Sequence, residues 1–149
     1  MLETHAERLP DDYRRNALDF NYAQVHFYRK EYDKVLERLQ AVEYQDPAYA
    51  LNSRNLLIAV YYELGQLGPL GSAIDSFRAY LKRRQGLSDS LRQAYRNLLN
   101  ATLRLSKATK RDTRAHEKIE QYLLDHPHTA SLQWLSDKLA ELREGRRNW

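Results

Sequence analysis

The chain has 149 residues, about the size of one domain, and 42% of them are hydrophobic, which is enough to form a core. It contains no cysteine, so disulfides and thiolate chemistry are excluded, and its longest apolar run, residues 56–62, is too short for a membrane span or a signal peptide. The formal net charge is +4; the low content of Gly (five) and Pro (four) predicts a largely helical chain, and the absence of cysteine predicts a cytoplasmic protein.

The first predicted helices form a hairpin near the N-terminus. Residues 1–10 lack a sustained apolar period and are expected to form an N-terminal tail, after which Asp11 offers an N-cap. A break near residues 30–31 separates the first helix from a second one, which runs from Tyr32 to about Tyr44. Because the connection is short, the two helices should pack antiparallel.

A third helix is bracketed by start and stop signals. Asp46 can cap it, and Pro47 can take its first position, where the missing N–H costs nothing. Gly65 can end it in the left-handed conformation that other residues resist. The Gly- and Pro-rich stretch 65–71 then predicts a longer turn.

The fourth and fifth helices follow this turn. The fourth is predicted from about Gly71 to Arg84 and is ended by Gly86. Ser88 is the expected N-cap of the fifth helix, which continues to about Ser106.

The last two helices close the chain. The sixth is predicted to start at Asp112 and stop at Pro127, and the seventh to run from Thr129 to Arg143, ahead of a C-terminal tail over residues 144–149. One side of the seventh carries Leu132, Leu135, Leu139 and Leu142. Such a helix can cover the apolar end of a stack of helices.

Three segments share one spacing of apolar residues, with members at offsets that place them on one helical face. They are Val35, Leu39 and Val42; Ala73, Phe77 and Tyr80; and Ala115, Ile119 and Tyr122. With the small and aromatic residues before them, these segments resemble the tetratricopeptide repeat, and more loosely the C-terminal portion of larger bacterial proteins of that family. The resemblance implies an all-α fold: a right-handed α-solenoid of three antiparallel helix hairpins plus a C-terminal capping helix, in a single domain over residues 11–143.

The resemblance also implies a concave groove that binds a peptide or a partner protein. In that family the first helix of each hairpin lines the groove. The matching partner-binding positions here are Phe20, Gln24, Tyr28, Asn52, Asn55 and Glu63. The alternative is that Phe20 and Phe27 are buried between hairpins and that no groove is open.

Positive charge is concentrated in the centre of the chain. Residues 78–114, the basic segment, hold eleven Lys or Arg and only two acidic residues, while the flanks are acidic. Within this segment, Arg92, Arg96, Asn100 and Arg104 recur every four residues as a ridge, opposite an apolar side that includes Leu91. An acidic peptide or a phosphate backbone can bind such a ridge, or the cations simply keep the helix soluble or pair with the acidic flanks.

No motif of catalysis or metal binding is complete. His116 and Glu117 begin a zinc-protease pattern that fails because residue 120 is Glu, and His126 and His128 flank a proline in a turn. We therefore expect no enzyme activity, no cofactor and no metal.

The favoured function is a non-catalytic protein–protein interaction scaffold that uses its helical-repeat surface. The alternative is binding of nucleic acid or another polyanion through the basic segment. Leu18 and Tyr22 belong to an incomplete-looking start of the array. This predicts self-association or continuation into a longer repeat array.

Overall fold

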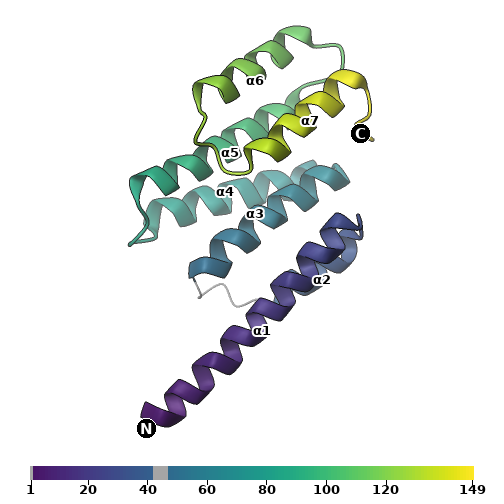
Figure 1. Ribbon diagram of the computed structural model, residues 1–149. Helices are drawn as coiled ribbons and strands as arrows, with labels where there is room; N and C mark the ends of the chain where they lie inside the picture. Colours follow the sequence, from purple (N-terminus) through teal and green to yellow (C-terminus); the bar gives the residue numbers. More distant parts are fainter. Residues whose placement is uncertain (1, 42–46) are drawn as a thin grey trace. The chain divides into compact units, whose positions relative to one another are not determined.

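The computed structural model describes residues 2–41 and 47–149, and within these ranges every regular element is an α-helix (Figure 1). The helices are α1 (Leu2–Tyr28), α2 (Tyr32–Ala41), α3 (Pro47–Leu64), α4 (Leu67–Arg83), α5 (Asp89–Lys107), α6 (Thr113–Asp125) and α7 (Leu132–Glu144). The predicted all-α class is confirmed. Among these helices, none has the length and hydropathy that crossing a bilayer requires.

The chain divides into two compact parts, unit 1 (residues 1–64) and unit 2 (residues 65–149). Each has its own set of packed helices and is described by itself. The single domain predicted for residues 11–143 stays a prediction.

Unit 1 is built on a hairpin in which α2 folds back along α1 (Figure 1), and α3 packs against both helices. Its core consists of Phe20, Ala23, Val35, Leu39 and Val60, surrounded by partly buried aromatic and aliphatic side chains. Val35 and Leu39 are therefore core residues, as their spacing predicted. Val42, the third member of that segment, lies outside the described residues, as do the predicted helix end at Tyr44 and the cap at Asp46.

The α1–α2 turn confirms the predicted break near residues 30–31. Lys30 has a φ of 60°, in the left-handed region, and the Glu31 N–H donates to the His26 carbonyl at 2.9 Å. The start predicted at Asp11 is wrong, because α1 begins at Leu2 and takes in most of the predicted tail. An apolar stripe marks only the part of a helix that packs against a neighbour, so it does not fix where the helix begins.

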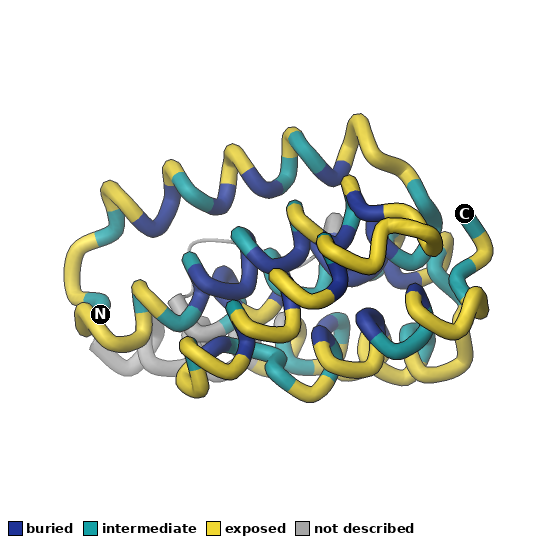
Figure 2. Tube along the Cα trace, turned by 90° about the horizontal axis from the view of Figure 1, so that it is seen from above, coloured by how far each residue is buried: buried dark blue, intermediate teal, exposed yellow. Residues whose placement is uncertain are grey.

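Unit 2 consists of α4 to α7, with α5 packed against the other three (Figure 1). The inward face of each helix is buried and the outward face is exposed, so burial alternates along the trace (Figure 2). The most buried side chains include Ile74, Phe77, Leu98, Leu99, Leu105, Ile119 and Leu135. Phe77 and Ile119 come from the repeated segments, and their predicted place in the core is confirmed.

Helix ends in unit 2 follow the predicted caps in most cases. The Ser88 hydroxyl accepts the Leu91 N–H, and the Asp112 carboxylate accepts the Ala115 N–H, each at 3.1 Å. Gly65 follows the end of α3 with a φ of 66°, as predicted.

The predicted long turn at residues 65–71 is wrong, because α4 already begins at Leu67 and includes Gly68 and Pro69 in its first turn. The first N–H groups of a helix have no intrahelical acceptor, so a proline there removes no hydrogen bond. The start of α7 moves the other way, from the predicted Thr129 to Leu132.

The last residues of the chain fold back onto α5. The Arg147 guanidinium donates to the carbonyls of Leu105 at 2.9 Å and Ala108 at 2.8 Å, at the C-terminal end of that helix. It also lies 3.8 Å from the centre of the Trp149 ring. These contacts add donors to carbonyls at the end of the helix, where intrahelical hydrogen bonds run out; the Leu105 carbonyl also accepts the Ala108 N–H at 3.3 Å.

Candidate functional site

The predicted groove residues of unit 1 divide into buried and exposed sets. The Phe20 side chain is only 9% exposed, and its ring lies 5.8 Å from that of Tyr49 in the core. Gln24 and Asn52 are exposed, whereas Asn55 and Glu63 are half-buried. The Phe20 ring is thus part of the core of unit 1, whereas Phe27, the other ring of the alternative interpretation, is only partly buried; whether a groove is open stays a prediction.

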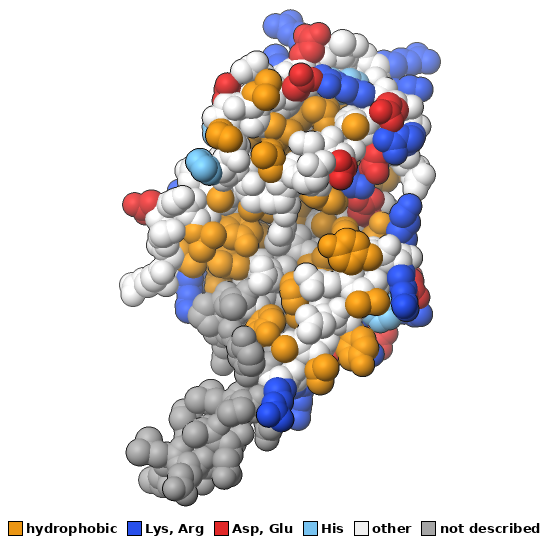
Figure 3. Space-filling view, in the orientation of Figure 1, with side chains coloured by type: hydrophobic (Ala, Val, Ile, Leu, Met, Phe, Trp, Pro, Cys, Tyr) orange, Lys and Arg blue, Asp and Glu red, His pale blue; other side chains and the backbone are white. Residues whose placement is uncertain are grey.

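A continuous apolar stripe lies exposed on α1. Its members, which we call the α1 stripe, are Leu18, Tyr22, Val25 and Tyr28, and they are 56%, 49%, 43% and 83% exposed. Their spacing places them along one side of the helix. Hydrophobic side chains are visible at the surface over α1 and α2 in Figure 3. Single exposed apolar residues are ordinary, but a stripe along three turns of one helix is the pattern of a docking face.

The middle of the α1 stripe is held in place by α2. The Arg38 guanidinium lies 4.6 Å from the centre of the Tyr22 ring, and it also approaches the Asp19 carboxylate at 3.6 Å. Tyr22 therefore presents a fixed ring at the surface.

The predicted arginine ridge on α5 does not face solvent as one row. The Arg92 Nη2 donates to the carbonyls of Arg84 at 3.2 Å and Leu87 at 3.4 Å, so this side chain holds the turn between α4 and α5. Arg96 is half-buried, and Arg104 is exposed. Leu91, which was placed on the apolar side, is 39% exposed.

The fourth member of that row, Asn100, is the centre of a polar network between three helices. Its side-chain oxygen accepts from Arg78 of α4 at 2.8 Å, and its amide donates to the Tyr122 hydroxyl of α6 at 3.2 Å. The Tyr122 hydroxyl in turn donates to the buried Asn97 at 3.3 Å. These bonds fix the position of the Tyr122 ring.

A cavity of about 590 Å³ opens between the C-terminal half of α5 and the length of α6, which we call the α5–α6 cavity. Its residues are Arg104, Lys107, Ala108, Asp112, Ala115, Lys118, Ile119, Gln121, Tyr122 and Asp125. Ala108 and Ile119 are buried, and Ala115 and Tyr122 are half-buried, so the floor is largely apolar. The charged side chains are exposed and form the rim.

The two carboxylates of the rim already have donors. Asp112 accepts the Ala115 N–H, and Asp125 accepts the Gln121 amide at 2.8 Å. The three cations of the rim, Arg104, Lys107 and Lys118, have no carboxylate partner in the described part of the chain. Arg104 instead lies 4.4 Å over the Tyr122 ring.

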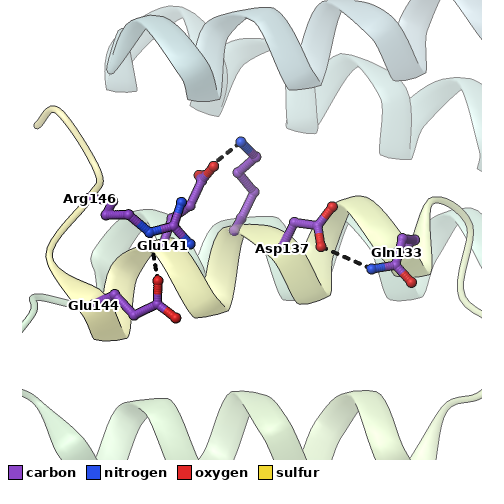
Figure 4. A network of polar contacts seen from close by, with 6 residues as sticks. Gln133, Asp137, Glu141, Glu144 and Arg146 are labelled. Atoms are coloured by element: carbon purple, nitrogen blue, oxygen red, sulfur yellow. Dashed lines mark hydrogen bonds and ion pairs between the residues drawn. The ribbon is translucent and has the colours of Figure 1, made fainter.

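Three acidic residues on the C-terminal side of the basic segment have donors from the same end of the chain. On α7, Lys138 donates to Glu141 at 2.8 Å and Gln133 donates to Asp137 at 2.9 Å (Figure 4). Arg146 donates to Glu144 at 2.6 Å in the same view. Over α6 and the ends of its neighbours, basic and acidic side chains alternate on the visible surface (Figure 3).

Two of the three histidines of unit 2 contribute to local structure. His116 is buried, and its Nε2 lies 2.8 Å from the Thr109 carbonyl, which joins α6 to the loop before it. His126 stacks on the Tyr122 ring with the ring centres 4.2 Å apart. Both side chains are used in packing at the end of a helix.

Sequence reasoning identified Arg104 but missed Lys107 and Lys118, the other two cations of the cavity. The available signal was the spacing on α6, where residues 115, 118, 119 and 122 share one face. Which face of α5 meets that face depends on tertiary packing.

A comparison of the chain with protein-family models, curated proteins and solved structures finds no match.

Proposed function

We propose that the chain is a non-catalytic protein-interaction scaffold with a tetratricopeptide-like arrangement of helix hairpins. Within unit 1, α1 packs on α2 and α2 on α3, and within unit 2, α4 packs on α5, α5 on α6 and α6 on α7, so successive helices are stacked as in a helical repeat. In such folds the consensus residues pack against one another in the core, and the surfaces are available for binding.

The α1 stripe is the observation that carries this proposal. Leu18, Tyr22, Val25 and Tyr28 stand at offsets of zero, four, seven and ten, the pattern with which one helix packs against another. The partner is an apolar helical surface, either on another protein or on a further copy or repeat of the same kind. Gln24, Asn52, Asn55 and Glu63 add amide and carboxylate groups that can bind a peptide backbone.

The experiment replaces two members of the stripe without disturbing the core. In the double variant Leu18→Gln and Val25→Gln, both side chains are exposed and glutamine is a good helix former, so the melting temperature should change little. Leu124→Gln is the matched control, because Leu124 is an apolar residue of unit 2 that is also exposed, at 68%.

The readouts are affinity capture from the native cell extract with mass spectrometry and sedimentation velocity of the purified protein. Proteins captured by the wild type and by Leu124→Gln should be lost with the double variant, or the wild-type self-association should disappear. A loss of more than about 1 kcal/mol in binding free energy is expected for such anchors. Equal capture and equal sedimentation for all three proteins would refute the assignment of the α1 stripe.

A polyanion-binding function through the basic segment has one specific observation in its favour. In the described part of the chain, its eleven cations form no ion pair with an acidic side chain. Arg78 donates to the side-chain amide oxygen of Asn100, and Arg92 donates to backbone carbonyls. The other cations of the basic segment can therefore bind a ligand. Binding of a single-stranded oligonucleotide should then weaken steeply as the salt concentration rises.

A further inference from the structure

We propose that the α5–α6 cavity binds an acidic segment of a partner protein, with a carboxylate of that segment among Arg104, Lys107 and Lys118. An apolar side chain of the same segment lies on the floor between the two helices. This inference rests on the proposed scaffold function and specifies the chemistry of a second contact, on unit 2.

The shape of the cavity fits a few side chains of an extended peptide. Its volume of about 590 Å³ is within the range of roughly 300–1,000 Å³ that is usual for ligand sites. The floor is formed by Ala108 at the end of α5 and by Ala115 and Ile119 on α6. Because Ala108 and Ala115 have short side chains, they leave the space between the two helices open.

The charge of the rim selects an anion. Arg104, Lys107 and Lys118 contribute three positive charges against two negative ones from Asp112 and Asp125, whose carboxylates are hydrogen-bonded within the chain, so the rim has a net charge of +1. A carboxylate from a partner therefore gains hydrogen bonds and ion pairs without displacing an existing ion pair.

The site is held in shape before any ligand arrives. Tyr122 is fixed by hydrogen bonds to Asn97 and Asn100, and Arg104 lies 4.4 Å over its ring. Stacking on the ring limits the rotamers of the long arginine side chain. Less conformational entropy is then lost when the guanidinium binds an anion.

The same features favour an acidic peptide over a nucleic acid. Single strands bind where bases stack on exposed rings, but the ring of Tyr122 is covered by Arg104 and stacked with His126. The remaining floor is aliphatic, so it can hold an apolar side chain of a peptide but has no group that pairs with a base or a phosphate. A peptide can alternate carboxylates with apolar side chains and so match both parts of the site.

The probes are short fluorescent peptides that alternate glutamate with leucine or phenylalanine, and their glutamine counterparts. Fluorescence anisotropy is measured with the full chain. Arg104→Gln and Lys118→Gln each remove a rim charge, whereas Ala115→Leu fills the floor without changing the charge. Lys82→Gln is the matched control, because Lys82 is an exposed cation at the end of α4 and does not line the cavity.

The glutamate peptides should bind the wild type and Lys82→Gln equally, and each of the three cavity variants should weaken them by about tenfold. Glutamine peptides should bind at least tenfold more weakly. Circular dichroism confirms that the variants fold.

Three results would overturn the inference. The first is absence of binding by the glutamate peptides, and the second is equal weakening by Lys82→Gln, which indicates non-specific attraction. The third is tighter binding of a single-stranded oligonucleotide that depends on Arg104 and Lys118. Because these variants leave the α1 stripe intact, capture of partners that depends on Leu18 and Val25 would still support the scaffold function.

Discussion

Glu31 forms two hydrogen bonds across the turn between α1 and α2. Its carboxylate accepts from the Lys34 ammonium at 2.7 Å and lies 3.3 Å from Nδ1 of His26. These bonds, with that from Lys34 first, hold the pKa of Glu31 below its ordinary value of 4.5. A carboxyl group with a lowered pKa stabilises the fold above its ordinary pKa, and this contribution is lost as the pH falls through the lowered value.

Glu31→Gln should therefore change the pH dependence of stability. At neutral pH the variant should melt slightly below the wild type, and the difference should shrink as the pH falls from about 5 towards 3, because protonation removes the same interactions from the wild type. Thermal melts by circular dichroism at several pH values measure it. A constant difference across that range would contradict the role of Glu31.

At the residue scale, the sequence predicted side chains best where one helix face decides burial. Val35, Leu39 and Phe77 are buried as their spacing indicated. Ala115 belongs to a segment with the same spacing, but it is only half-buried and lines the α5–α6 cavity. Periodicity gives the face of a helix on which a residue lies, whereas the distance to the neighbouring helix depends on side chains far away in the sequence.

At the scale of elements, caps predicted starts and stops better than apolar patterns did. Ser88, Asp112 and Gly65 each end or begin a helix as expected, because their local hydrogen bonds or backbone angles are encoded by a few neighbouring residues. The start of α4 was misplaced because Gly68 and Pro69 punctuate loops and are equally tolerated in a first turn. The docking of Arg147 on α5 is a contact between distant residues and has no local signal.

Arg147→Ala should lower the stability of unit 2. It removes two charge-assisted hydrogen bonds from half-buried carbonyls at the end of α5, which should cost about 1–3 kcal/mol in the free energy of unfolding. Arg146→Ala is the matched control, because Arg146 is exposed and pairs with Glu144 two residues away; its cost should stay within about 0.5 kcal/mol. Urea denaturation measures both. Equal effects of the two variants would show that the carbonyl contacts of Arg147 contribute nothing.

At the scale of the whole molecule, the two units have opposite charge. Residues 1–64 contain eight Lys or Arg and eleven Asp or Glu, a net charge of −3, whereas residues 65–149 contain sixteen and nine, a net charge of +7. This asymmetry was visible in the sequence, and so was the helical class. The α5–α6 cavity was not, because it exists only where two helix faces meet.

Matched core variants test whether each unit has its own cooperative core. Leu39→Ala in unit 1 and Leu98→Ala in unit 2 each remove a fully buried side chain, at a cost of about 2–5 kcal/mol. Scanning calorimetry should show two transitions. Each variant should lower the temperature of only the transition that belongs to its own unit. A single transition that both variants lower equally would show that the units unfold as one.

The position of the two tryptophans gives unit 2 its own optical signal. Trp134 lies on α7 and Trp149 is the last residue shown, so both indoles belong to residues 65–149. The Trp149 ring lies against Gly65, where an added Cβ would stand 2.6 Å from it. Unit 1 carries tyrosine but no tryptophan. Indole emission thus comes only from residues of unit 2, and comparison with far-ultraviolet dichroism, which sums all helices, gives two signals that weight the two halves of the chain differently without any label.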